Sequence, residues 1–122
     1  MCYSVFRERT DDVSASTDDP ILKRFKAALQ EIYGDQIERI VLYGSRARGE
    51  AQPDSDYDVA LFLRQVPDRG QERHRLADLR VDFIDDTGAF FDAKAFSIVA
   101  YGDRTPLMHE IRRDGLDMKN DI

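Results

Sequence analysis

The chain has 122 residues, a length that fits one domain on the usual scale of roughly 100–200 residues per domain. Hydrophobic residues make up 42% of the sequence, enough to bury a core without cross-links. The single cysteine, Cys2, excludes an intramolecular disulfide, and no apolar run approaches the roughly 18–20 residues of a membrane helix. A net charge of −6 argues against stable nucleic-acid binding. We therefore expect a cytoplasmic protein without a membrane partner.

Residues 1–18 mix charged and small polar residues with little period, so we expect an N-terminal arm, mobile in solution, followed by a domain over residues 19–122. Asp19-Pro20 is typical of a helix start, because the carboxylate accepts a free backbone N–H and proline fits the first turn. Apolar residues then recur at three- and four-residue spacing, which predicts a helix that ends at Gly34.

The next segments read as strands separated by turns. Residues 37–43 and 56–63 are rich in consecutive apolar residues, as in buried strands, and residues 45–49 between them predict a helical turn. We expect a short helix over 71–78 and a third strand over 79–84. Two helices then follow, one carrying the apolar residues of segment 90–99 and one opening at Thr105-Pro106.

Three aspartates are the candidate catalytic groups. Successive side chains of a strand point to opposite faces, so Asp56 and Asp58 share one face and Tyr57 between them points into the core. Asp82 joins them if the third strand is a neighbour of the second. Carboxylates held this close repel one another, and their hard oxygen ligands favour Mg²⁺ or Mn²⁺. An isolated Asp-x-Asp is more often a solvated turn, but its position at the start of an apolar strand favours a metal site.

A candidate phosphate site precedes these acids. Gly44-Ser45 lies where the first strand gives way to the helical turn, a place where free backbone N–H groups and the serine hydroxyl can hold phosphate oxygens. Arg46 and Arg48 add positive charge nearby. We take Arg46 as the candidate for a further phosphate contact, the alternative being a solvated surface charge.

Gly44-Ser45, a ten-residue spacer and Asp56-Tyr57-Asp58 resemble the signature of the minimal nucleotidyltransferases of the DNA polymerase β superfamily. The stretch VLYGSRARGEAQPDSDYDVALFL resembles the family's core, Val81-Asp82-Phe83 its third-acid strand, and the final IRRDGL its usual close, so the resemblance covers residues 20 to about 117. It implies the minimal polymerase β-like fold, an α/β (α+β) domain with a small mixed sheet flanked by helices. Asp85 and Asp86 stay open as alternatives to Asp82.

The resemblance also implies a reaction. ATP would be the substrate and two Mg²⁺ ions, or Mn²⁺, the cofactors, with Asp56 and Asp58 binding both ions and Asp82 binding the one that activates the attacking hydroxyl. Gly44, Ser45 and Arg46 would bind the nucleotide. Family members of this size commonly act as antitoxins paired with HEPN ribonuclease toxins, and some transfer AMP onto a tyrosine of the toxin.

We therefore expect an adenylyltransferase antitoxin that forms a hetero-oligomer with a HEPN toxin. Two alternatives remain open at this point: an antitoxin that acts by binding and occlusion alone, and a nucleotidyltransferase that acts on a small molecule.

Overall fold

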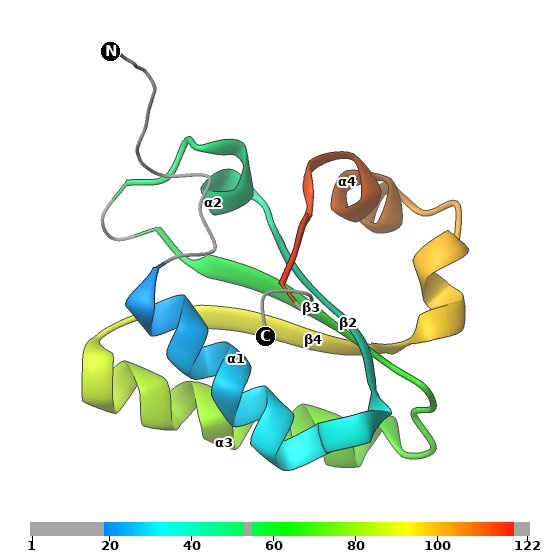
Figure 1. Ribbon diagram of the computed structural model, residues 1–122, viewed down its shortest axis with the longest axis horizontal. Helices are drawn as coiled ribbons and strands as arrows, with labels where there is room; N and C mark the ends of the chain where they lie inside the picture. Colours follow the sequence, from blue (N-terminus) through cyan, green and yellow to red (C-terminus); the bar gives the residue numbers. More distant parts are fainter. Residues whose placement is uncertain (1–18, 53–54, 119–122) are drawn as a thin grey trace.

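The computed structural model describes residues 19–52 and 55–118, so the predicted arm over 1–18 lies outside the described residues. No helix within the described ranges is both long and apolar enough to span a bilayer. Along the chain the elements are α1 (Pro20–Tyr33), η2 (Gly34–Gln36), β2 (Ile37–Tyr43), α2 (Ser45–Arg48), β3 (Tyr57–Leu63), α3 (Arg69–Thr87), β4 (Phe91–Ser97), η3 (Ile98–Gly102), α4 (Pro106–Asp114) and β5 (Leu116–Asp117) (Figure 1).

The four strands form one mixed sheet in the order β4-β3-β2-β5. The central strand β2 runs antiparallel to β3 and β5, whereas β3 and β4 are parallel. The parallel pair needs a long crossover connection, and α3 provides it. The small mixed sheet flanked by helices that the sequence predicted is therefore confirmed.

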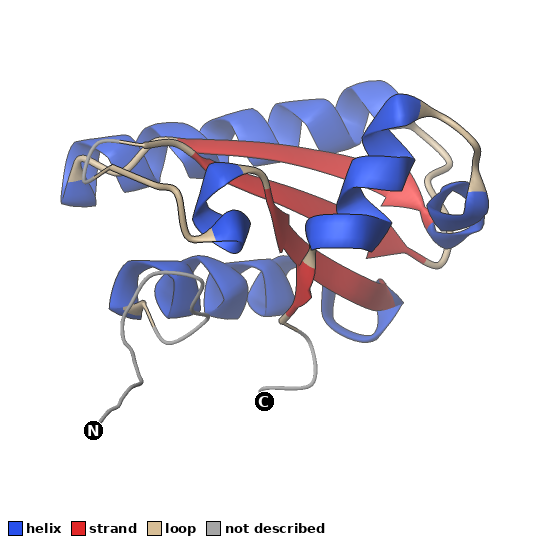
Figure 2. Cartoon of the chain, turned by 90° about the horizontal axis from the view of Figure 1, so that it is seen from above, coloured by secondary structure: helices blue, strands red, loops and turns tan. Residues whose placement is uncertain are grey.

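The two faces of the sheet carry different helices. Helices α1 and α3 pack on one face through a cluster that includes Phe25, Leu76 and Val59, and α4 packs on the other through Met108 and Phe62. Figure 1 shows α2 and α4 on the upper side of the sheet, and Figure 2 looks down onto that side. Because side chains alternate along β3, Tyr57 points toward α1 whereas Asp58 points toward the face that carries α4.

The first half of the chain folds as the sequence predicted. The Asp19 carboxylate accepts hydrogen bonds from the backbone N–H groups of Ile21 and Leu22, at 2.8 and 3.3 Å, and so caps α1. The helix ends at Gly34, whose positive φ of 54° suits glycine. The two strands predicted over 37–43 and 56–63 and the helical turn between them are also present as β2, β3 and α2.

The second half differs from the prediction in two places. Residues 79–84 are not a strand but the last turns of α3, in which the alternating Val81 is 56% exposed. Residues 91–97 are not helical but form β4, and segment 98–102 is the 3-10 helix η3. In β4 the buried Phe91 and Ala93 alternate with Asp92 and Lys94, which is the two-residue period of a strand. The predicted helix at residue 106 is confirmed as α4.

Phe91 anchors β4 to the layer of α1 and α3. Its ring stacks on Phe25 with 3.9 Å between ring centroids and on Tyr57 with 4.5 Å, and it meets the edge of Phe83 at 5.5 Å. Phe91 is fully buried, whereas the preceding Phe90 is 45% exposed. Phe91 therefore fixes the start of the edge strand, next to Asp92, in addition to the pairing of β4 with β3.

Replacing Phe91 with alanine should lower the free energy of unfolding by about 3–5 kcal/mol, because the change leaves a cavity between three aromatic rings. The matched change Phe90→Ala should cost about 0.5 kcal/mol, as for most exposed side chains. Urea unfolding followed by circular dichroism measures both. Equal losses in the two variants would contradict the strand assignment of residues 91–97.

Candidate functional site

The candidate site lies on the face of the sheet that carries α2 and α4, where β2 ends and β3 and β4 begin. Gly44 follows β2 with a φ of 77° and a ψ of −157°, a conformation that in practice only glycine adopts. A Cβ added there would overlap Oδ2 of Asp58. The glycine of the Gly44-Ser45 pair is thus required both for the turn out of β2 and for the close approach of the carboxylate.

Helix α2 begins at Ser45 directly after this turn, and no described side chain caps its N-terminus. The backbone N–H groups at the start of a helix have no partner within the helix itself. Gly44, the residue directly before them, leaves no room for a Cβ because the Asp58 carboxylate approaches it closely. The structure therefore brings together the predicted phosphate-binding residues Gly44 and Ser45 and one of the predicted acids.

Three aspartates, which we call the site acids, meet on this face: Asp56, Asp58 and Asp92. Asp58 pairs with Asp92 in the parallel register of β3 and β4, and Asp56 lies two residues before Asp58. Burial raises the pKa of Asp58, and the charges of Asp92 and Asp56 raise it further. In the described part of the chain, no hydrogen bond or ion pair holds the carboxylates of Asp56 and Asp58. Asp56 and Asp58 lie close together, as predicted, and their negative charges repel each other.

Asp82 does not join this group. It lies exposed on α3, a helix that covers the opposite face of the sheet. The prediction that Asp82 lies beside Asp56 and Asp58 is therefore wrong. Asp85 and Asp86 are on the same helix, and Asp86 pairs with Arg24 of α1. The structure instead places Asp92 beside Asp58. In FDAKAFS, Phe91 and Ala93 alternate with the charged Asp92 and Lys94, and this alternation is the signal that would have found Asp92.

Lys94 forms an ion pair with one of the site acids. It lies two residues after Asp92 on the same face of β4, and its Nζ is 3.0 Å from Asp92 Oδ2. Its charge also lowers the pKa of Asp58, although the raising effects are larger. Among the described residues, no three His, Cys, Asp or Glu side chains already surround one common metal position.

Helix α4 borders the site through an ion-pair network with α2. The Arg48 guanidinium lies 3.3 Å from Glu110 and 3.8 Å from Asp114, both on α4, and 2.9 Å from Glu50. The Glu110 charge contributes to the raised pKa values of both Asp58 and Tyr43. Arg48, which the sequence marked only as extra positive charge, therefore holds two elements of the site together.

Arg46 lies against the segment that leads into β3. Its guanidinium stacks on the Tyr57 ring at 3.9 Å and donates hydrogen bonds to the carbonyl oxygen of Ser55, at 3.0 Å from Nε and 2.8 Å from Nη2. These contacts fasten the loop that leads into β3. Tyr57 itself is buried, as predicted, and its hydroxyl donates a hydrogen bond to Asp19. Arg46 thus holds Ser55 and Tyr57 at the start of β3, and its contact with a phosphate stays a prediction.

Gly44→Ala tests the contact with Asp58. We expect a loss of roughly 3 kcal/mol in the free energy of unfolding, because the alanine is strained at this φ and ψ and its Cβ displaces the carboxylate. Gly88→Ala is the comparison: Gly88 has the same φ of 77°, but no atom lies within 4 Å of an added Cβ. That variant should lose only about 1 kcal/mol. Denaturant unfolding of both variants measures the difference, and equal losses would argue against the contact.

Asp58→Asn tests the charge repulsion. A raised pKa in the folded state means that ionisation of Asp58 opposes folding, so the penalty is absent below about pH 4 and develops as the pH rises. The neutral amide should therefore raise Tm by roughly 2–4 °C at pH 8 in EDTA and leave it unchanged near pH 4. Asp82→Asn, on an exposed helix face, should change Tm at neither pH. Thermal scans across this pH range are the measurement, and a lower Tm for Asp58→Asn at pH 8 would contradict the repulsion.

The chain is similar in sequence to two proteins of Methanocaldococcus jannaschii with the names "Putative protein adenylyltransferase MJ0141" and "Putative protein adenylyltransferase MJ1305". It is 38% identical to the first over 47 residues, which are 38% of this chain and 48% of that protein. It is 37% identical to the second over 65 residues, which are 52% of this chain and 44% of that protein. The chain thus spans about half the length of these relatives.

Solved structures share the fold. A chain in a crystal structure of a toxin-antitoxin with AMP-PNP matches with a TM-score of 0.57 at 17% identity, over 81% of this chain and 76% of that one. A mutant of the toxin-antitoxin MntA-HpeT matches with a TM-score of 0.56 at 15% identity, over the same shares. A chain in the structure of a tri-AMPylated Shewanella oneidensis HEPN toxin in complex with MNT antitoxin matches with a TM-score of 0.50 at 13% identity, over 83% of this chain and 76% of that one.

The family described as "Nucleotidyltransferase domain" matches residues 22–95. This segment is more than half of the chain, and it runs from α1 through the glycine turn and all three site acids into β4. The solved structures add the same fold, and the resemblance that the sequence suggested is confirmed at the level of the family. This chain belongs to the nucleotidyltransferase domain family.

Proposed function

We propose that this protein is an antitoxin that transfers AMP from ATP to a tyrosine hydroxyl of a HEPN toxin. The observation that carries the proposal is the contact between Gly44 and Asp58, because it joins a phosphate-binding turn and a carboxylate group at one point. Membership of the nucleotidyltransferase family supports the reaction class. The reaction consumes ATP, so we expect it to take place in the cytoplasm.

The site acids fit a divalent cation by the chemistry of their donors. Asp56 and Asp58 offer hard carboxylate oxygens without a hydrogen-bonded or ion-paired partner in the described chain, and Mg²⁺ or Mn²⁺ prefers such ligands. Burial and the charges of Asp92 and Asp56 raise the pKa of Asp58 more than Lys94 lowers it, so a bound cation would stabilise the ionised carboxylate. We propose that Asp56, Asp58 and Asp92 hold two Mg²⁺ ions, with Asp92 released from Lys94. Bound there, the ions would supply charge neutralisation for the triphosphate and activation of the attacking hydroxyl.

The chain's own residues would position ATP. The backbone at Gly44 and the start of α2, with the Ser45 hydroxyl, would hold the β- and γ-phosphates, which sets the α-phosphorus over the site acids. The tyrosine oxygen of the acceptor then attacks the α-phosphorus, one P–O bond forms, and the bond to the bridging oxygen of the β-phosphate breaks. Pyrophosphate leaves, and the hydroxyl proton passes to a carboxylate of the site acids and on to water.

The nature of the acceptor comes from the comparisons. The solved structures that share this fold belong to toxin-antitoxins, one with AMP-PNP and one with a tri-AMPylated HEPN toxin, and the curated relatives are named for protein adenylylation. We infer by likeness that this chain also has a toxin as its partner and forms a hetero-oligomer with it.

Asp92→Asn and Asp82→Asn together test which acid completes the site. A candidate HEPN toxin serves as the acceptor in an incubation with ATP and Mg²⁺, and intact mass spectrometry counts AMP-sized increments. Asp92→Asn should slow transfer by roughly a hundredfold or more, because several kcal/mol of charge stabilisation are lost. Asp82→Asn should keep the rate within about twofold.

The double variant Asp56→Ala, Asp58→Ala separates enzyme from binder. It should give no mass increment while it still binds the toxin. If it neutralised the toxin as well as the unchanged protein does, the antitoxin would act by occlusion. If the unchanged protein bound no toxin and instead adenylylated a small hydroxylated molecule, the acceptor would be wrong although the reaction class would stand.

A further inference from the structure

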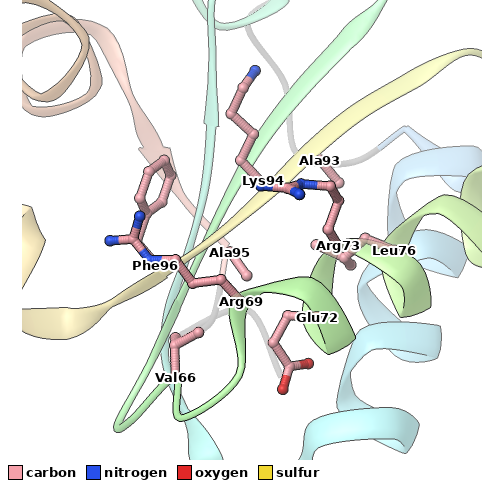
Figure 3. Close-up of a pocket in the computed structure, with 9 residues that line it drawn as sticks. All are labelled: Val66, Arg69, Glu72, Arg73, Leu76, Ala93, Lys94, Ala95 and Phe96. Atoms are coloured by element: carbon pink, nitrogen blue, oxygen red, sulfur yellow. The ribbon is translucent and has the colours of Figure 1, made fainter.

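A second concave site lies on the other side of β4 from its partner β3, between β4 and the first turns of α3. It is a pocket of about 300 Å³. Its walls come from Val66, Leu76, Ala93 and Ala95, and its rim carries charged side chains (Figure 3). This volume is at the low end of ligand sites, so it suits one or two side chains rather than a whole nucleotide.

The pocket carries more positive than negative charge, because Arg69, Arg73 and Lys94 line it together with one carboxylate, that of Glu72. Arg69 and Arg73 are exposed, one helical turn apart on α3, and Figure 3 shows both guanidinium groups reaching toward β4. Within the described residues, no carboxylate pairs with either of them. Glu72, between them in sequence, is buried, points the other way in Figure 3 and lies 3.6 Å from Arg75. The whole protein has a net charge of −6, but these two arginines have no ion-paired carboxylate in the described chain. They therefore favour binding of an anionic group at the pocket.

The shape of the surroundings favours a peptide. β4 is the edge strand of the sheet, with β3 as its one neighbour in the described structure, so its outer N–H and C=O groups are open to another strand. Extended peptides bind such edges through main-chain hydrogen bonds and place alternate side chains in adjacent pockets. The small side chains of Ala93 and Ala95 leave room for such a side chain beside β4.

The pocket is connected to the site acids through Lys94. This lysine lines the pocket and also holds Asp92, which is two residues away, or roughly 7 Å along a strand. A segment bound along β4 would therefore bring a neighbouring residue close to the site acids.

We propose that the pocket between α3 and β4 binds an acidic side chain on an extended segment of the protein acceptor, held between Arg69 and Arg73. The inference deepens the proposed function and rests on it, since it assumes that the acceptor is a protein.

The first test measures peptide binding and does not depend on AMP transfer. A synthetic peptide of alternating glutamate and threonine with one tyrosine is titrated into the isotope-labelled protein, and backbone amide shifts are followed by NMR. We expect saturable shifts at residues 69–73 and 93–96 that weaken with salt. The same peptide with glutamine in place of glutamate should bind at least about fivefold more weakly. Equal binding of the two peptides, or no binding of either, overturns the proposal.

Variants then locate the charge. Arg73→Glu should weaken glutamate-peptide binding at least about fivefold, and adding Arg69→Glu should weaken it further. Arg104→Glu makes the same charge change at an exposed arginine outside the pocket and should leave binding within twofold. Thermal scans confirm that all variants fold. An equal loss in Arg104→Glu would show a general charge effect and contradict the pocket. Displacement of the peptide by ATP would assign the arginines to the nucleotide instead.

The AMP-transfer reaction tests whether the two arginines act in binding of the acceptor. With the toxin as acceptor, Arg69→Glu with Arg73→Glu should raise KM for the toxin and leave KM for ATP and the single-turnover rate at saturation unchanged. An unchanged KM for the toxin would overturn the role in acceptor binding. If the unchanged protein transfers no AMP yet binds the glutamate peptide through the arginines, the proposed reaction fails while the acidic-segment site stands.

Discussion

The site depends on the close approach of the Asp58 carboxylate to the backbone at Gly44. Pairing of β2 with β3 brings Asp58 opposite Tyr43, directly before the turn. The positive φ of Gly44 then directs the chain away from the sheet into α2, and the absent Cβ leaves the space that Oδ2 of Asp58 occupies. One backbone position thus sets the distance between free helix N–H groups and a carboxylate. Any residue with a side chain would separate the two halves of the site, whichever other residues were present.

The same approach concentrates negative charge on a half-buried surface. Asp56, Asp58 and Asp92 lie together with Glu110 nearby, and they have one ion-paired cation in the described chain, because Lys94 pairs with Asp92 whereas Arg48 joins α2 to α4. Natural proteins accept such local conflicts at functional sites and compensate for them in the rest of the fold. Here the compensation comes from the aromatic layer below the sheet, in which Phe91 is fixed between Phe25 and Tyr57. The layer holds β3 and β4 in register against the repulsion between their aspartates.

The sequence contained the local parts of this site but not its third acid. Gly44-Ser45 and Asp56-Tyr57-Asp58 lie on elements whose period and turn residues are unambiguous, and both were predicted in the correct places. The third acid was not, because segment 79–84 alternates by chance: Val81 is exposed on α3, and the helix buries Leu76, Leu79 and Phe83 at helical spacing instead. Which segment pairs with β3 is decided by tertiary packing, and the fully buried Phe91 fits that place. The contacts of Arg46 could not be predicted either, because its stacking on Tyr57 depends on the path of the loop before β3, which residue spacing does not reveal.

The distribution of charge around β4 limits what can bind on either side of it. On the α4 face the site acids repel an anionic ligand, so the triphosphate that we propose would bind there only together with divalent ions. At the outer edge of β4, by contrast, Arg69 and Arg73 attract an anion, and the small pocket suits a single carboxylate at the end of a side chain. Lys94 belongs to both surroundings, and its ion pair with Asp92 competes with any ion that needs this carboxylate. The acidic segment that we propose for the pocket would therefore lie next to the one residue that both lines the pocket and pairs with a site acid.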